Sequence, residues 1–328
     1  MSAAPDTLVV EDLHTHFFTK SGVVKAVDNV SFAVRSGEVL GLVGESGSGK
    51  TVTGFSIIGL IDPPGRIVSG SIRFRGKELV GAGEESLRRV RGNRIAMIFQ
   101  DPTMTLNPVL RIDTQLIEAI TAHSDTDKRT AREQARDALG QVGLPSPEER
   151  LKCYPHELSG GMRQRVAIAI AFLNKPDLII ADEPTTALDV TIQAQIIHEA
   201  QILCAKTGTA LVWITHDLAV VAGLADRICV MYAGRIVEEG SADDVIDRPL
   251  HPYTAGLIGS VPSHNKRGQR LTQIPGATPS LLNLPRGCAF RTRCDHGDEA
   301  CLAAPEVTHP AKGRRLRCFH PVSGAAAP

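Results

Sequence analysis

The sequence predicts an α/β fold built around a sheet with buried central strands. Segments of strand pattern and of helix pattern alternate through most of the 328-residue chain. Three apolar segments, 38–43, 178–184 and 210–215, are typical of buried strands. Glycine or ionisable residues end or follow each segment. Because ligands of open α/β sheets bind at the carboxyl ends of the strands, we expect a binding site along this edge.

Composition bounds the fold and its partners. The length allows about two domains, and the 42% content of hydrophobic residues is ordinary for a packed core. Lys and Arg number 36, as do Asp and Glu, so a nucleic-acid-binding surface is not indicated. No apolar run approaches the ~18–20 residues of a spanning helix, and residues 1–13 lack a signal-peptide pattern. We therefore expect a cytoplasmic protein that reaches a membrane only through a partner.

The N-terminal third predicts strands around a phosphate-binding loop. Residues 13–17 alternate in strand fashion, and 23–34 and 70–74 are typical of further strands. Residues 44–51, GESGSGKT, match the pattern G-x-x-x-x-G-K-[ST], and 51–60 predict the helix that follows. In this pattern Lys50 reaches the β- and γ-phosphates and the Thr51 hydroxyl faces Mg²⁺. The predicted nucleotide contacts are Gly44, Glu45, Ser46, Gly47, Ser48, Gly49, Lys50, Thr51 and Val52.

A second phosphate-binding element begins about 115 residues after the first. Residues 158–165, LSGGMRQR, form a glycine turn that opens a helix at 162–172, and residues 113–142 predict a polar helical lobe that carries it. The Ser159 hydroxyl and the N–H groups at Gly160 and Gly161 are suitable phosphate donors. Since one ATP needs only one such loop, the pair indicates nucleotide shared with a second copy or a relative.

Polar residues at three strand ends predict hydrolytic chemistry. Asp182 and Glu183 end the segment 178–184, where we expect a Mg²⁺ carboxylate and a general base that polarises water. The alternative is a helix N-cap acid pair. Gln100 ends the strand 95–99 as a further polar terminus. His216 follows 210–215 as a γ-phosphate sensor or, alternatively, as a capping or core histidine.

Four of the seven cysteines gather near the C-terminus, with the spacing C-x5-C-x6-C-x16-C. Cys153, Cys204 and Cys229 are scattered and predict core or incidental thiols. Disulfides would be unusual in a reducing cytoplasm, whereas a zinc site and an iron–sulfur cluster both remain open on spacing alone. Nearby arginines either offset thiolate charge or form a solvated basic face. The gathered cysteines are Cys288, Cys294, Cys301 and Cys318, and the arginines are Arg286, Arg291, Arg293, Arg314, Arg315 and Arg317.

The order and spacing of these motifs over residues 8–250 resemble the nucleotide-binding subunit of an ABC transporter. The resemblance implies a P-loop NTPase with a RecA-like core, a β-rich ATP-binding subdomain and a helical signature subdomain at about 101–165. It implies catalytic roles for Glu183, His216, Gln100 and Lys50. It also implies Mg²⁺ contacts from Thr51, Gln100 and Asp182, and a competent site. The implied motifs are Walker A (44–51), the Q-loop (Gln100), the signature (158–164), Walker B (Asp182 with Glu183), the D-loop (187–189) and the switch histidine (His216).

The resemblance also implies how nucleotide is shared. Adenine stacks on an aromatic ring upstream of Walker A, for which we predict Phe17 rather than its neighbour Phe18. Two subunits pair head to tail, and the signature residues of each contact ATP held by the other; here these are Ser159, Gly160, Gly161 and Gln164. The implied partners are a second ATPase subunit, often a paralogue, two transmembrane permease subunits and, indirectly, an extracytoplasmic solute-binding protein. The chain would then lie peripherally on the cytoplasmic face of the inner membrane.

Two segments resemble the oligopeptide/dipeptide branch of that family. Residues 101–108 resemble its Q-loop, and residues 251–262 with 287–294 resemble its C-terminal extension. Members of this branch are associated with a [4Fe–4S] cluster, which implies that Cys288, Cys294, Cys301 and Cys318 are ligands, in a structural or a redox role. We therefore expect domains at 1–255 and 256–328, with a disordered tail at 323–328.

The expected function is MgATP hydrolysis coupled to peptide import. A machine of the same kind that imports nickel or another small solute is the alternative, because other subunits choose the cargo. A soluble ABC ATPase acting on DNA or the ribosome is disfavoured by the single phosphate-binding loop, the missing coiled-coil arm and the zero net charge.

Overall fold

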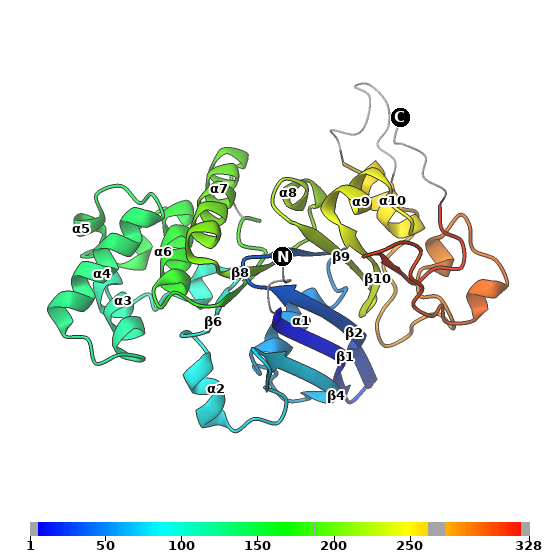
Figure 1. Ribbon diagram of the computed structural model, residues 1–328, viewed down its shortest axis with the longest axis horizontal. Helices are drawn as coiled ribbons and strands as arrows, with labels where there is room; N and C mark the ends of the chain where they lie inside the picture. The colour runs from blue at the N-terminus through cyan, green and yellow to red at the C-terminus, as the bar shows by residue number, and fades with distance from the viewer. Residues whose placement is uncertain (1–5, 187, 262–272, 323–328) are drawn as a thin grey trace. The chain divides into compact units, whose positions relative to one another are not determined.

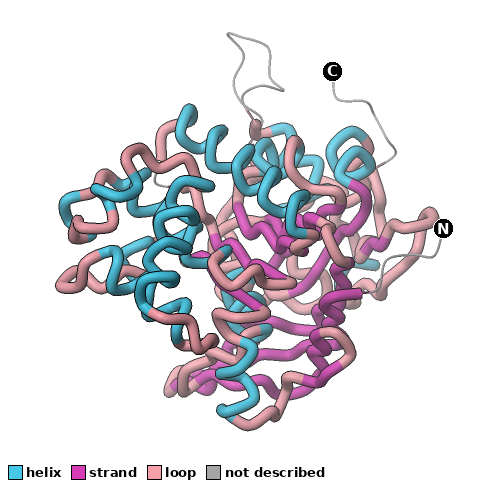
Figure 2. Tube along the Cα trace, turned by 60° about the vertical axis from the view of Figure 1, so that its left-hand side comes forward, coloured by secondary structure: helices cyan, strands magenta, loops and turns pink. Residues whose placement is uncertain are grey.

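The computed structural model describes residues 6–186, 188–261 and 273–322. Helices and strands alternate along the chain, which confirms the predicted α/β class (Figures 1 and 2). Contacts divide the chain into two compact units. The first consists mainly of residues 81–212, and the second of 8–33, 39–80 and the chain from 213 onward.

An antiparallel sheet of the second unit has the strand order β2-β1-β4-β5. Its strands are β1 (Asp6–Thr19), β2 (Gly22–Arg35), β4 (Gly65–Phe74) and β5 (Lys77–Glu78). The predicted strands at 13–17, 23–34 and 70–74 are all present and longer than expected. Leu8, Leu13 and Val30 are fully buried, so one face of this sheet faces the core of the unit.

The second unit also holds the strand that precedes the phosphate-binding loop. The strand order is β11-β10-β9-β3, with β3 parallel to β9 and the other pairs antiparallel. The helix predicted at 51–60 is shorter, because Gly59 adopts a left-handed backbone (φ 66°) just past its end. The elements are β3 (Val39–Val43), α1 (Lys50–Ile57), α8 (Leu218–Ala222), β9 (Arg227–Tyr232), β10 (Arg235–Ser241), α9 (Ala242–Asp247), α10 (Pro252–Gly259) and β11 (Arg315–Leu316).

The cysteine-containing region packs within the second unit. Its regular structure in the described residues is β11 and the short 3₁₀ turns η4 (Arg291–Arg293) and η5 (Ala300–Leu302). The Phe290 ring lies 5.3 Å from that of Tyr232 and 5.4 Å from that of Tyr253, centroid to centroid. Helix α10 runs across the expected domain boundary at 255/256, and a separate domain stays a prediction. The tail expected to be disordered, 323–328, lies outside the described residues.

A buried histidine joins this aromatic cluster. His251 is 1% exposed, and its Nδ1 accepts a hydrogen bond from the Tyr253 backbone N–H at 3.0 Å. Burial lowers the pKa of His251 to about 3, so the ring is neutral in the folded protein. An unfolded histidine titrates near pH 6.5. Protonation of the unfolded chain therefore opposes folding below that pH.

We expect the free energy of unfolding to fall as pH drops from about 6.5 toward 4.5. In this window His251 binds a proton in the unfolded state but not in the folded state. The slope from this one group is at most about 1.4 kcal/mol per pH unit. His251→Asn replaces the capping acceptor Nδ1 by an amide oxygen and should flatten the dependence. Urea unfolding at several pH values measures it, with exposed His309→Asn as control. An unchanged slope in His251→Asn would contradict the assignment.

In the first unit, helices lie along the range in which a helical subdomain is predicted, about 101–165, and the last of them continues to Phe172. Its strands have the order β8-β7-β6, with β6 parallel to β7, and β8 ends in the second unit. Buried Leu116, Ala135 and Val166 come from three of the helices and form part of its core. The elements are α2 (Glu84–Val90), β6 (Ile95–Ile98), η1 (Pro102–Met104), α3 (Ile112–Thr121), α4 (Lys128–Gln141), α5 (Pro147–Arg150), η2 (Pro155–Glu157), α6 (Gly160–Phe172), β7 (Leu178–Asp182), α7 (Val190–Thr207) and β8 (Ala210–Thr215).

Among the described residues, none of the helices combines the length and the apolar character required to cross a membrane.

Candidate nucleotide site and cysteine cluster

The loop 44–51 connects β3 to α1 and needs glycine at two positions. A Cβ atom on Gly44 would lie 2.1 Å from the Met231 carbonyl oxygen, and one on Gly49 would lie 2.1 Å from that of Ala26. Both backbones also have positive φ, 159° and 101°, which L side chains rarely adopt. The loop therefore packs against its neighbours in a conformation that only glycine permits at these two points.

Lys50 begins α1 and is 4% exposed. Its Nζ donates to the carbonyl oxygens of Gly44 at 2.7 Å and Glu45 at 2.9 Å. The ammonium thus spans the loop from the inside, at the N-terminus of a helix whose dipole favours anions. This is the arrangement expected of a phosphate-binding lysine.

Phe17 lies on the face of β1 that faces α1, the helix that follows the loop. It lies two residues after Thr15, whose hydroxyl is 2.8 Å from that of Ser56 in α1. Residues two apart on a strand share a face, so Phe17 lies on the α1 side and Phe18 on the other. Phe18 is 40% exposed and lies under the Arg66 guanidinium, 4.3 Å from the ring centroid. The placement is compatible with Phe17 as the adenine platform, and that role stays a prediction.

An ion pair ties the cysteine-containing region to the loop. Arg293, from the turn η4, donates to the Glu45 carboxylate at 2.6 and 3.0 Å, and Thr278 donates to the same group at 2.9 Å. Burial raises the pKa of Glu45, but these bonds and the charge of Arg293 outweigh burial and lower it. Sequence reasoning missed this tie, because the partners are far apart in the chain and carry no local signal.

In the first unit, strand register brings two predicted catalytic residues together. Ile98 of β6 lies opposite Ala181 of β7 in a parallel pair. Continuing this register by two residues places Gln100 opposite Glu183, and Gln100 Nε2 donates to Glu183 Oε2 at 3.3 Å. Asp182, the last residue of β7, is 2% exposed. The carboxyl edge of these strands thus carries the acids predicted there.

The backbone of Glu183 is strained. It adopts φ 44°, a left-handed conformation that costs of order 1–3 kcal/mol for a non-glycine residue. The Thr186 hydroxyl donates to its carboxylate at 2.9 Å and fixes the side chain. Such strain persists where surrounding structure holds a functional group in place. Thr186 was missed in the sequence, although a hydroxyl three residues after the acid was the available signal.

The glycine turn of the signature caps α6 at the edge of a cavity. Ser159 is the N-cap, and its hydroxyl accepts from the Met162 N–H at 3.3 Å. Ser159, Gly160 and Gly161 line a cavity of about 670 Å³ that Asp189 also lines. Ser159 and Gly160 are exposed, so the open end of this helix is accessible from solvent.

Two other predicted positions have different surroundings. Gln164 is only 2% exposed. His216 follows β8 in the second unit and is exposed, which argues against a core histidine. Of the predicted D-loop, Ala187 lies outside the described residues, and Asp189 accepts from the Ile192 N–H as the N-cap of α7.

The four C-terminal cysteines lie within electrostatic reach of one another. Burial and then the thiols of Cys288, Cys294 and Cys301 raise the pKa of Cys318 to about 12. The His320 N–H donates to Cys318 Sγ at 3.3 Å. No three of the four sulfurs lie within 4.8 Å of one another in the described chain. A single zinc ion needs sulfurs about 3.8 Å apart at its Zn–S distance of ~2.3 Å, so the set is more open than a zinc site.

Four of the six nearby arginines have polar partners other than the thiols, and their effect on thiolate charge stays a prediction. The pairs are Arg293 with Glu45, Arg314 with Glu238, Arg315 with Glu239 and Arg317 with Asn29. Among the scattered thiols, Cys204 and Cys229 are buried as predicted, and Cys153 is half-buried.

A P-loop α/β fold with a separate signature helix, capped by a serine and begun by two glycines, defines an ATP-binding cassette ATPase. A family model described as ABC transporter matches residues 27–186. The structure aligns with a solved ATP-binding cassette, MJ0796, a dimer in a post-hydrolysis state bound to ADP and Pi. Its TM-score is 0.66 at 25% identity, covering 72% of this chain and 98% of that one.

Sequence comparison specifies the family. The chain is 49% identical over 315 residues to the oligopeptide transport ATP-binding protein OppD of Escherichia coli K12, covering 96% of this chain and 93% of OppD. It is 47% identical over 322 residues to the dipeptide transport ATP-binding protein DppD of the same organism, covering 98% of each. A model of the oligopeptide/dipeptide transporter C-terminal region matches residues 237–301. The chain belongs to this family of transport ATP-binding proteins and is an ABC-type ATP hydrolase.

Proposed function

We propose that this chain hydrolyses MgATP to drive import of oligopeptides or dipeptides through a transporter at the cytoplasmic face of the cell membrane. The observation that carries the proposal is the hydrogen bond between Gln100 and Glu183, two residues predicted to act at the γ-phosphate. The relatives of this chain are peptide transport ATP-binding proteins. The proposed partners are a second ATPase subunit, two permeases and a solute-binding protein.

Each catalytic residue has a proposed task. Glu183 orients the attacking water and accepts its proton, with its carboxylate fixed by Gln100 and Thr186. When nucleotide binds, the Lys50 ammonium leaves its carbonyl partners in the loop and contacts the β- and γ-phosphates. His216 senses the γ-phosphate. Thr51, Gln100 and Asp182 are the proposed Mg²⁺ contacts. When bound, Mg²⁺ would neutralise negative charge that develops on the phosphates during transfer.

The signature residues are proposed to act on the nucleotide of the partner. Ser159, Gly160 and Gly161 offer an accessible helix N-terminus beside an open cavity, which suits the γ-phosphate of an ATP on another subunit. ATP then holds the two subunits together, and hydrolysis removes the γ-phosphate contacts and releases them. The buried side chain of Gln164 supports a role in positioning α6 more than one in direct contact.

We also propose that the C-terminal extension, residues 256–328, carries a [4Fe–4S] cluster on Cys288, Cys294, Cys301 and Cys318, which would close it as a small domain. Two observations support this proposal: the charges of the other three thiols act on Cys318, and the His320 N–H donates to the Cys318 sulfur. Iron and acid-labile sulfide assays on anaerobically purified protein test this. Stoichiometric zinc without sulfide would contradict it.

Uptake by the reconstituted transporter tests the cargo. Proteoliposomes with the permeases, both ATPases and the solute-binding protein should accumulate labelled di- or oligopeptides only with MgATP. Nickel and other small solutes should not compete. If nickel stimulated ATP hydrolysis and peptides did not, the cargo would be a metal rather than a peptide.

A further inference from the structure

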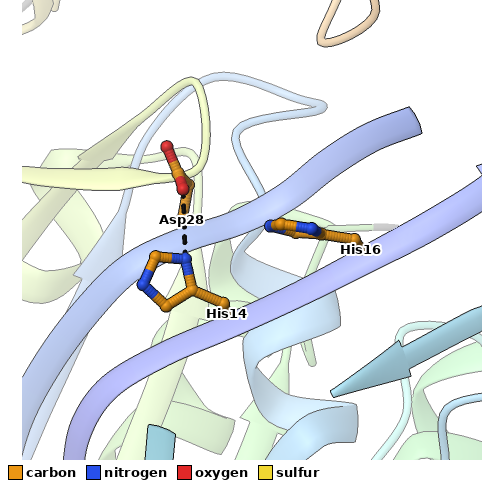
Figure 3. Close-up of side chains that lie close together, drawn as sticks. All are labelled: His14, His16 and Asp28. Atoms are coloured by element: carbon orange, nitrogen blue, oxygen red, sulfur yellow. Dashed lines mark hydrogen bonds and ion pairs between the residues drawn. The ribbon is translucent and has the colours of Figure 1, made fainter. Parts of the chain in front are cut away.

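Three metal-binding side chains that the nucleotide motifs do not use gather on the antiparallel sheet of the second unit (Figure 3). His14 and His16 come from β1, and Asp28 comes from β2. One donor atom from each lies within 4.8 Å of the other two. His14 and His16 are two residues apart on the strand, so they share the face opposite Thr15. The sheet itself therefore presents three donors to one point.

One donor atom of the cluster has no hydrogen-bond partner among the described residues. His16 Nε2 is a buried atom without one, whereas buried polar atoms are nearly always satisfied. An imidazole nitrogen without a hydrogen-bond partner, beside a carboxylate, is what a cation site requires.

Arg235 holds one oxygen of the Asp28 carboxylate, and the other oxygen lies beside His14. Arg235 donates to Oδ2 through Nε at 2.9 Å and Nη2 at 2.6 Å, while Oδ1 lies 3.1 Å from His14 Nδ1. A hydrogen bond that fixes the outer oxygen of a ligating carboxylate is typical of metal sites.

We propose that His14, His16 and Asp28 bind one divalent transition-metal ion of the zinc type. Two imidazoles and one carboxylate suit Zn²⁺, and a fourth position stays open to water. Bonds of ~2.0–2.1 Å around a tetrahedral ion separate ligand atoms by about 3.3 Å, close to the 3.1 Å between His14 Nδ1 and Asp28 Oδ1. The metal replaces the proton between these two atoms.

A bound ion would connect β1 to β2 through His16, the residue immediately before Phe17. The site would therefore stabilise the second unit as well as bind metal. Its ligands are distinct from the four cysteines, and this distinction makes the proposal measurable in the whole protein. Cobalt on imidazole and carboxylate gives only d–d absorption, whereas cobalt on thiolates adds a charge-transfer band.

The test is a Co²⁺ and Zn²⁺ titration of the full chain, anaerobic and with its cysteine site intact, for wild type and His14→Ala/His16→Ala. Wild type should bind one equivalent more than the variant, without thiolate charge transfer, and the melting temperature should rise with Zn²⁺ only in wild type. His156→Ala/His309→Ala removes two exposed histidines and should behave as wild type.

A single substitution guards against misfolding of the double variant. His16→Gln keeps a polar side chain of similar size and should bind this equivalent at least tenfold more weakly. Equal stoichiometry and affinity in wild type and in His16→Gln would overturn the proposal. So would a cobalt spectrum in which every bound equivalent shows thiolate charge transfer.

Discussion

Glu183→Gln should bind ATP normally and lose turnover by about 10²–10⁴-fold, the range that general-base catalysis contributes. The substitution preserves size, and the new amide oxygen still accepts from Gln100, whose Nε2 now lies 3.3 Å from the carboxylate. An amide cannot take a proton from water at neutral pH. The loss of turnover therefore measures how much Glu183 contributes by accepting a proton, separately from its role in positioning the water.

Phosphate release by the assembled transporter, measured with labelled ATP binding on the same sample, checks this result. Glu133→Gln, an exposed acid on α4, is the control and should turn over like wild type. Unreduced hydrolysis in Glu183→Gln would remove this residue from the role. Loss of ATP binding in the variant would instead indicate that Glu183 shapes the pocket.

The features that local sequence determines were predictable. The loop 44–51 was found because its glycines and lysine are contiguous, and their backbone geometry follows from positive φ and close neighbours. The acids at 182 and 183 were found because an apolar strand ends there. Parallel register then joins Gln100 to Glu183, although sequence alone could not supply that register.

The remaining contacts depend on tertiary pairing that leaves no local pattern. Arg293 is 248 residues from Glu45, and nothing near either residue indicates the other. His14 and His16 look like polar positions in an alternating strand until β2 brings Asp28 beside them. The strained backbone of Glu183 is equally invisible, because the residues flanking it are ordinary in a strand-to-loop transition. The ion pair, the histidine–aspartate cluster and the Glu183 backbone all depend on the topology of the chain rather than on its composition.

Gly160→Asp is the second substitution for which we expect a large effect, and it separates folding from nucleotide sharing. No described atom lies within 4 Å of a Cβ built on Gly160, so the new side chain meets open space. An acid in the first turn of α6 also interacts favourably with the helix dipole, by ~0.3–1 kcal/mol. Stability should therefore be unchanged or slightly higher. The carboxylate would, however, face the γ-phosphate of the partner's ATP, where like charges repel.

Turnover by the complex carrying Gly160→Asp should consequently fall at least about a hundredfold, as on loss of a phosphate-stabilising donor. ATP binding to the variant's own loop should persist, because Lys50 and its carbonyl partners belong to the other unit of the chain. Gly160→Asn is the matched control: it has the same shape without the charge and should retain most activity. If the Asp and Asn variants hydrolyse ATP at the same rate, no phosphate lies near Gly160, and the signature must act by another route than direct contact.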